Sequence, residues 1–175
     1  MRWLNITLPN PHDDPDAVRR WRHGVLEMQA GRLVRLRLHW LPKIISRAAI
    51  YTAGRWVHGR MGGDRLWLYY NQPLSAPQYL SLAYVVSTRE TSYQSLWRAM
   101  ATLDEIAQIK RSDGIVCELS NRRISHRLMQ RLGYARHLED SRGRHYIKRF
   151  YGDYSTRLYA QTLAPTHEPA VVTAG

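Results

Sequence analysis

The stretch that decides the fold is residues 113–152, which reads DGIVCELSNRRISHRLMQRLGYARHLEDSRGRHYIKRFYG. Its first apolar run has the length of a buried strand. Asn121 is a good helix cap, and Gly133 is a good helix stop because glycine adopts the left-handed conformation at little cost. Two further strand-like runs flank Arg142-Gly143. The stretch therefore predicts a strand (115–119), a helix (121–132) and a hairpin (137–140 with 145–150).

The preceding segment predicts a strand followed by a long helix. Residues 79–86 are almost continuously apolar, as expected for a strand that is covered on both faces. A helical pattern begins at Thr91, after the overlapping capping-box patterns 87–90 and 91–94. Its apolar stripe consists of Leu96, Met100, Leu103 and Ala107. A right-handed crossover would make strands 79–86 and 115–119 parallel neighbours that diverge toward their C-terminal ends.

The N-terminal half predicts one helix and then antiparallel strands. Asp16 is expected to cap a helix over residues 17–29 that stops at Gly31, because Val18, Trp21, Val25 and Met28 lie at helical spacing. Apolar and polar residues then alternate over 32–40, which predicts a strand. Residues 44–56 and 65–71 are expected to be further strands, although residues 44–51 could equally form a helical turn. The whole order predicts an α/β fold with a mixed sheet and helices on both faces.

Length and composition favour one domain with an ordinary core. The chain has 175 residues, of which 44% are hydrophobic. We expect an N-terminal extension (1–16), one domain (17–154) and a disordered tail (155–175). No apolar run approaches the roughly 18 residues that cross a bilayer, and no signal-peptide pattern is present. Cys117 is the single cysteine and the eight histidines lack metal-ligand spacing, so we expect no membrane contact, no metal and a cytoplasmic location.

The charge of the chain has two interpretations. The formal net charge is +12, and only three of the 26 basic residues are lysines. Such an excess suits an anionic partner, such as a nucleic acid or a phosphorylated cofactor. The same excess of arginine can equally reflect composition alone. Both interpretations stay open at this point.

The element order over residues 17–151 resembles that of the GNAT superfamily of CoA-dependent N-acyltransferases, and Asn121 with Gly133-Tyr134 matches the family's Asn-helix-Gly-aromatic segment. The resemblance implies a GNAT-like, largely antiparallel sheet with helices on both faces. It also implies acetyl-CoA or another acyl-CoA as cosubstrate, and a small-molecule or protein amine as acceptor.

In that family, pantetheine pairs with the open edge of the central strand, and the pyrophosphate lies at the N-terminus of the following helix. Here the loop contains no glycine, unlike the family's phosphate loop, but Arg89 can neutralise a phosphate and two hydroxyl groups can donate to it. The resemblance therefore places the cofactor on Val85, Val86, Ser87, Arg89, Thr91, Ser92 and Asn121.

Two positions bear on catalysis. The resemblance places the family's usual proton-donating Tyr at Met129, or at Leu128 one residue earlier, and neither side chain carries an exchangeable proton. Glu118 is the candidate base, because a carboxylate within an apolar strand would have a raised pKa. The alternative for Glu118 is an ion pair with an arginine.

A second function remains open from the sequence. Arg123, Arg127 and Arg131 recur every four residues and would form one stripe on the predicted helix. Such a stripe is usually only solvated, but it can also follow a phosphate backbone. The alternative to an acyltransferase is therefore a catalytically inactive GNAT-fold binding module for an anionic partner such as nucleic acid.

Overall fold

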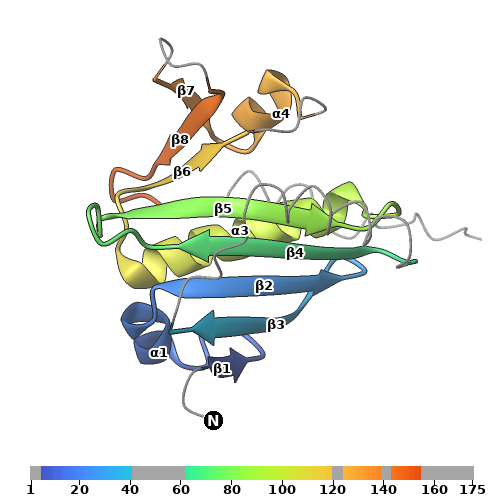
Figure 1. The fold of residues 1–175 in the computed structure, drawn as a ribbon, viewed down its shortest axis with the longest axis horizontal. Helices are drawn as coiled ribbons and strands as arrows, with labels where there is room; N and C mark the ends of the chain where they lie inside the picture. The colour runs from blue at the N-terminus through green and yellow to red at the C-terminus, as the bar shows by residue number, and fades with distance from the viewer. Residues whose placement is uncertain (1–4, 41–61, 120–123, 139–142, 155–175) are drawn as a thin grey trace, which may run out of the picture.

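The computed structural model describes residues 5–40, 62–119, 124–138 and 143–154. The described strands form one open sheet in the order β1-β3-β2-β4-β5-β6-β8-β7, in which β5 and β6 are parallel and the other described neighbours are antiparallel (Figure 1). The fold is therefore α/β with a largely antiparallel sheet. In chain order the elements are β1 (Asn5–Leu8), α1 (Pro15–Arg20), β2 (His23–Gln29), β3 (Arg32–His39), β4 (Arg65–Asn71), β5 (Tyr79–Ser87), α3 (Tyr93–Lys110), β6 (Gly114–Glu118), α4 (His126–Arg131), β7 (Ala135–His137) and β8 (His145–Arg149).

The predicted strand-helix-strand unit is confirmed as β5, α3 and β6. The parallel register runs from Tyr79 opposite Gly114 to Leu82 opposite Cys117. The predicted stripe of α3 faces the core, since Met100, Leu103 and Ala107 are buried. The helix cap differs from the two predicted capping boxes: the Oγ of Ser92 accepts a hydrogen bond from the Ser95 N–H at 3.2 Å.

The helix predicted over residues 17–29 is wrong. Helix α1 ends at Arg20, and the following residues form β2, which pairs with β3 on one side and β4 on the other. Ala30 and Gly31 have φ angles of 50° and 74°. Two successive positive φ angles are typical of a tight hairpin turn, so the glycine predicted as a helix stop connects two strands. The cap is Asp14 rather than Asp16, with the Ala17 N–H donating to its Oδ1 at 2.9 Å.

The C-terminal unit agrees with the prediction in order but not in all its bounds. Helix α4 begins after Ser125, whose Oγ accepts a hydrogen bond from the Leu128 N–H at 3.1 Å. Gly133 has a φ of 84°, which confirms the predicted stop. β7 and β8 form the predicted hairpin, although β7 begins at Ala135. Asn121, the predicted strand 44–56 and the predicted tail 155–175 lie outside the described residues.

The core lies between the sheet and α3. This helix contacts β2, β3, β4 and α1, so α1 and α3 cover the same face of the sheet. A helix covering the opposite face is not seen in the described residues. Residues 5–8, within the predicted extension, pair with β3 and belong to the sheet. Side chains with no exposed surface at the centre of the core are Leu26, Leu36, Leu68, Leu103 and Ile106.

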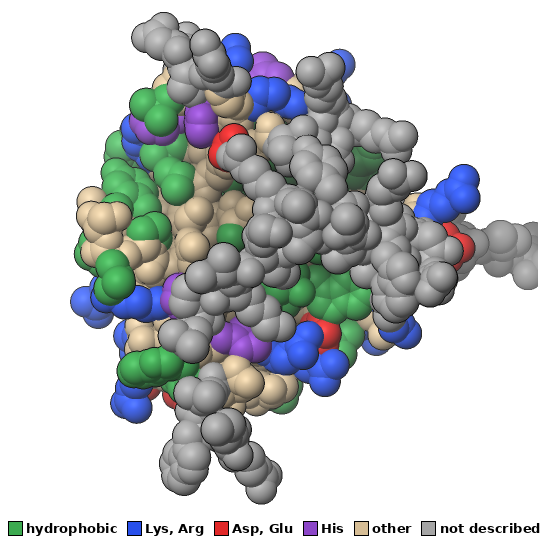
Figure 2. Space-filling model, in the orientation of Figure 1, with side chains coloured by type: hydrophobic (Ala, Val, Ile, Leu, Met, Phe, Trp, Pro, Cys, Tyr) green, Lys and Arg blue, Asp and Glu red, His purple; other side chains and the backbone are tan. Residues whose placement is uncertain are grey.

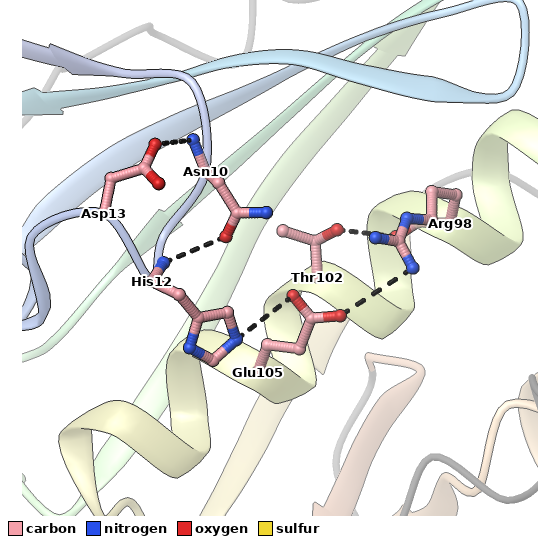
Figure 3. Close-up of polar contacts among 6 residues, drawn as sticks. All are labelled: Asn10, His12, Asp13, Arg98, Thr102 and Glu105. Carbon is pink, nitrogen blue, oxygen red and sulfur yellow. Dashed lines mark hydrogen bonds and ion pairs between the residues drawn. The ribbon is translucent and has the colours of Figure 1, made fainter.

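The turn before α1 is tied to α3 by polar contacts (Figure 3). The Asn10 N–H donates to Oδ2 of Asp13, and the His12 N–H donates to Oδ1 of Asn10, both at 2.9 Å. The His12 ring lies 3.8 Å from one carboxylate oxygen of Glu105, and Arg98 lies 3.8 Å from the other. These contacts hold the first connection of the chain against the helix.

A buried ion pair connects α3 to the C-terminal strands. The Nζ of Lys148, on β8, lies 2.6 Å from Oδ2 of Asp104, whose side chain is 1% exposed. Lys148 itself is 11% exposed. A charge so far from water is tolerated only beside its counter-ion. The pair therefore fixes β8, and with it β6, against the middle of α3.

We predict that Lys148→Met lowers the free energy of unfolding by about 3–5 kcal/mol, because it leaves the carboxylate of Asp104 buried without its counter-ion. The matched control is Arg98→Met, which removes the more exposed pair with Glu105 and should cost below about 1 kcal/mol. Urea denaturation of the three proteins measures both effects. Equal losses in the two variants would contradict the prediction.

Candidate functional site where two parallel strands part

Strand β5 is longer than the partner that covers its edge. Its pairing with β6 ends at Leu82, whereas its pairing with β4 continues to Ser87. Figure 1 shows β6 turning away from β5 toward the C-terminal ends of the two strands. The second half of β5 therefore has an open edge on the β6 side within the described sheet.

A β-bulge lies at the point where the strands part. Tyr69 pairs with Tyr84 and Tyr70 pairs with Leu82, so Ala83 is an extra residue in β5. Bulges bend a strand and increase its twist, and they are enriched beside active sites. Ala83 is also the first residue beyond the pairing with β6. The bulge and the end of the parallel pairing therefore coincide.

The open edge presents backbone groups in an alternating pattern. The Thr88 N–H donates to the carbonyl of Arg65 at 3.0 Å, so the backbone polar groups of Thr88 point toward β4. Because successive residues of a strand point their N–H and C=O groups to opposite sides, Val86 also faces β4. Val85 and Ser87 then direct their N–H and C=O groups to the open edge. Val85 and Ser87, two of the predicted cofactor residues, therefore present backbone hydrogen-bonding groups at the open edge.

A cleft of about 290 Å³ lies between α3 and α4. Helix α3 follows β5 and α4 follows β6, so the cleft lies beyond the C-terminal ends of the two parallel strands, where open sheets commonly bind ligands. Two guanidinium groups and two aromatic rings make it suitable for an anion that carries an apolar portion. The cleft is lined by Tyr93, Trp97, Ser125, Arg127, Leu128 and Arg131.

The hydroxyl groups at the start of α3 already have partners. Thr91 donates through Oγ1 to the carbonyl of Arg65 at 2.7 Å, and Ser92 donates through Oγ to Oδ2 of Asp64 at 2.6 Å. The Ser92 N–H also donates to Oδ1 of Asp64 at 3.2 Å. The hydroxyls predicted to bind phosphate therefore hold this loop against the start of β4.

Asp64 places a negative charge beside the N-terminus of α3. Burial raises the pKa of its carboxyl group, but hydrogen bonds from Ser92 and Ser95 lower this pKa by more, so the net shift is downward. Asp64 is therefore ionised at neutral pH. An anionic ligand at this helix end would be repelled by that carboxylate and would need compensating positive charge.

Arginine side chains can supply that charge. Arg89 is exposed and makes no hydrogen bond or ion pair with any described residue. The carboxylate of the adjacent Glu90 accepts a hydrogen bond from the Gly63 N–H at 2.7 Å, which holds it against the preceding turn. Arg127 and Arg131 lie on the cleft wall. Arg89 therefore lies before the N-terminus of α3, whereas Arg127 lies in the first turn of α4 and Arg131 is the last residue of that helix.

The burial of the two candidate catalytic positions, Glu118 and the Leu128 or Met129 position, differs from what the sequence predicted. Glu118 is exposed at the end of β6, so the predicted burial of this carboxylate is wrong. Its strand neighbour Cys117 lies in the core, where burial raises the pKa of the thiol to about 12. Met129 is 3% exposed and faces the core, whereas Leu128 lines the cleft. Leu128 is therefore the residue that faces a ligand in the cleft.

Tyr93 and Trp97, which form the aromatic wall of the cleft, were not among the predicted site residues. Tyr93 and Trp97 are four residues apart and so share one face of α3. That spacing is the local signal that could have identified them. Ser125 was missed because the helix was expected to begin at Asn121.

The chain matches no protein-family model, no curated protein and no solved structure. In the part of the chain that the structure describes, no group of three or more His, Cys, Asp or Glu side chains is arranged to hold a metal ion. No helix in the same ranges is long and apolar enough to cross a membrane. A functional assignment therefore depends on the geometry of the strand edge and the cleft.

We predict that Asp64→Ala lowers the free energy of unfolding by about 1 kcal/mol at pH 7, because it removes an acceptor from the cap of α3. The folded-state pKa of Asp64 is below its ordinary value, so this stabilisation is present above the unfolded pKa and is lost as the pH falls through the folded pKa. The difference between the variant and the wild type should therefore decrease as the pH falls through the folded-state pKa of Asp64. Urea denaturation from pH 7 to pH 2 measures it, with the exposed Asp113→Ala as control.

Proposed function

We propose that the chain is a GNAT-like, CoA-dependent N-acyltransferase, which transfers an acetyl or other acyl group from CoA to an amine. One observation carries the proposal: β5 keeps an open edge of five residues at a bulge, and the helices that follow β5 and β6 enclose a cleft lined by arginines. An extended ligand with amide groups at one end and phosphates at the other fits this combination.

The pantetheine amides would pair with the backbone groups of Val85 and Ser87, as an added strand pairs with a sheet edge. The phosphates would lie near Arg89, Arg127 and Arg131. In this arrangement, side-chain charge takes the place of the glycine-rich phosphate loop. Repulsion from Asp64 would favour phosphate positions toward the α4 side of the cleft.

The chemistry requires two proton transfers. The amine nitrogen attacks the thioester carbonyl carbon, the C–S bond breaks, the nitrogen loses a proton and the thiolate gains one. Leu128 has no proton to give to the sulfur. Water would therefore protonate the thiolate, which favours slow turnover.

Nucleic acid binding is the alternative function. It would require the basic side chains to form a continuous surface. On the face drawn in Figure 2, Lys and Arg side chains are seen at several places, both at the edge and within the lower part of the outline. Two exposed arginines outside the cleft, Arg136 and Arg149, lie on β7 and β8 and would be part of such a surface. The cleft is favoured as the place where an anion binds because Arg127 and Arg131 both line this one concave surface.

We predict that acetyl-CoA at 100 times its dissociation constant stabilises the protein by about 2.7 kcal/mol, which a thermal-shift assay detects. Arg89→Ala and Arg127→Gln should each remove much of the shift. Arg149→Gln, which changes another exposed arginine outside the cleft, is the matched control. Absence of any shift at millimolar acyl-CoA, with salt-sensitive binding to RNA or DNA instead, would replace the acyltransferase with the binding module.

Two proline variants test the strand edge more directly. Val85→Pro should weaken acetyl-CoA binding about 2- to 10-fold, because it removes one N–H from the open edge while sparing the hydrogen bonds to β4. Val86→Pro removes an N–H that faces β4, so it should lower the melting temperature of the free protein by more than Val85→Pro does. If Val85→Pro lowers the melting temperature by more than Val86→Pro does, the open edge has been assigned to the wrong residues.

We predict that Leu128→Tyr raises the turnover number for acetyl transfer by about 10-fold or more, because general acid catalysis typically contributes about 10²- to 10⁴-fold. The matched control is Met129→Tyr, which puts the same hydroxyl into the core and should destabilise the protein without raising the rate. Steady-state kinetics and thermal melts of both variants measure this. A gain for Met129→Tyr alone would contradict the position assigned to the sulfur.

A further inference from the structure

The end of the sheet opposite the cleft gathers segments that are far apart in the chain. Cross-strand pairs align the strand ends here, from His39 on β3 through β2, β4, β5 and β6 to Arg149 on β8. The cleft lies beyond the C-terminal ends of β5 and β6, whereas this end holds their N-terminal ends. Figure 1 shows α1, the β4–β5 loop and the chain after β8 here, on the left. This end, the loop end, comprises residues 19–22, Trp40, residues 72–78, residues 110–113 and residues 149–154.

Three large apolar side chains project into solvent at the loop end. Trp40 is 65% exposed, Leu74 is 81% exposed and Tyr151 is 87% exposed. They follow β3, β4 and β8, so they are spread along the edge formed by the strand ends. The ring of Trp21 meets that of Trp40 edge-on, with centroids 6.2 Å apart. Single exposed apolar residues are ordinary, but several at one end of a molecule mark a surface that contacts another apolar phase.

Basic side chains surround these apolar residues. Arg20, Arg111 and Arg149 are exposed, and they come from α1, the end of α3 and β8. The carboxylates within the loop end are those of Asp113 and Asp153, so basic side chains outnumber acidic ones there. Hydrophobic and basic side chains are both seen along the left margin of Figure 2. The loop end therefore combines apolar tips with an excess of positive charge.

Hydrogen bonds join the segments of the loop end. The Nζ of Lys110 donates to the carbonyl of Trp21 at 2.9 Å and to Oε1 of Gln72 at 3.1 Å, which ties α3 to α1 and to the β4–β5 loop. The Asp113 N–H donates to the carbonyl of Gln78 at 2.7 Å, which ties the same loop to the start of β6. The apolar tips thus protrude from a braced surface, and bracing lowers the entropic cost of binding.

A small polar cavity of about 30 Å³ lies beside the loop end, with walls from β2, β3, β4 and β5. Tyr69 and Asn71 line it and alternate along β4 with Leu68, which is buried beneath α3. Because alternate residues of a strand point to opposite faces, the cavity opens on the face away from α3. The described residues that line it include no Lys or Arg. Contact with an anion at this end therefore falls to the exposed arginines.

We propose that the loop end docks the protein on a membrane surface rich in anionic lipids. Trp and Tyr side chains favour the boundary between water and hydrocarbon, which suits Trp40 and Tyr151, and Leu74 enters the hydrocarbon. Anionic headgroups attract the arginines. Single-stranded nucleic acid also binds aromatic and basic side chains, but it stacks on rings and makes no use of an exposed leucine at a loop tip. Leu74 therefore favours the membrane over RNA.

Docking of this kind needs no spanning segment, because side chains at a surface can enter the headgroup region alone. The expectation of no membrane contact depended on the lack of a run long enough to cross a bilayer. The cleft lies at the opposite end of β5 and β6, so a docked protein holds it away from the bilayer. The inference is independent of the acyltransferase proposal, and vesicles should leave the acetyl-CoA thermal shift unchanged.

The first experiment measures cosedimentation of the full chain with vesicles of phosphatidylcholine, alone or mixed equally with phosphatidylglycerol. The wild type should bind the mixed vesicles, and added salt should weaken binding. Leu74→Ser should lower the partition coefficient about 10-fold, and Arg111→Gln about 5-fold. The matched controls are Val34→Ser and Arg32→Gln, which change exposed residues near the other end of β3 and should bind like the wild type. No binding, or equal losses in variants and controls, overturns the proposal.

Quenching of tryptophan fluorescence by brominated lipid gives a second readout. The wild type should be quenched on mixed vesicles, and Trp40→Phe should bind nearly as well but be quenched less, because it keeps an aromatic ring and removes the fluorophore at the surface. Undiminished quenching in Trp40→Phe would overturn the orientation. Polyuridine is the competing ligand. Tight polyuridine binding that Trp40→Ala and Arg111→Gln weaken, with Leu74→Ser unaffected and no vesicle binding, would assign the surface to RNA and overturn the proposal.

Discussion

The rest of the site depends on one constraint, which is that β6 covers the edge of β5 for four residues and then leaves it. A strand edge without a partner exposes N–H and C=O groups that must bind water or another chain. β6 departs together with β8, its antiparallel partner, and Lys148 of β8 is fixed to Asp104 of α3 by the buried ion pair. The anchor on α3 keeps these strands attached to the domain while their far ends diverge. An open edge can therefore persist in a folded domain.

Each face of the sheet has a concavity near the place where β5 and β6 part, and the bulge at Ala83 lies at this place. On one face, α3 and α4 begin beyond the parted strands and enclose the cleft. On the other face, Ala83 and Tyr84 contribute to the small polar cavity. An extra residue is tolerated in β5 at this point because no β6 register has to be maintained beyond it. The small polar cavity thus lies against β5 at the bulge, and the cleft suited to an anion lies between the helices that follow β5 and β6.

The sequence predicted what local patterns determine and missed what long-range pairing determines. β5, α3 and β6 follow from apolar runs and helix periodicity, and Val85 and Ser87 lie on the part of β5 that β6 leaves open, with Arg89 in the loop before α3. Residues 23–29 have apolar residues at helical spacing, yet they pair with strands on both sides, and Gly24 leaves room for the ring of Tyr70. The polar cavity combines residues from four strands that are far apart in the chain, so no local motif could predict it.

The arginines explain why net charge alone could not decide between the two functions. Arg35 and Arg37 neutralise Glu27, and Arg19 pairs with Asp16, so these side chains contribute to the +12 charge without attracting a ligand. Arg127 and Arg131 line a concave surface instead. A phosphate held there by side-chain charge is screened by salt more strongly than one held by buried backbone N–H groups. In the proposed cofactor site, arginines would take the place of a glycine loop, so the strength of phosphate binding there would vary with ionic strength.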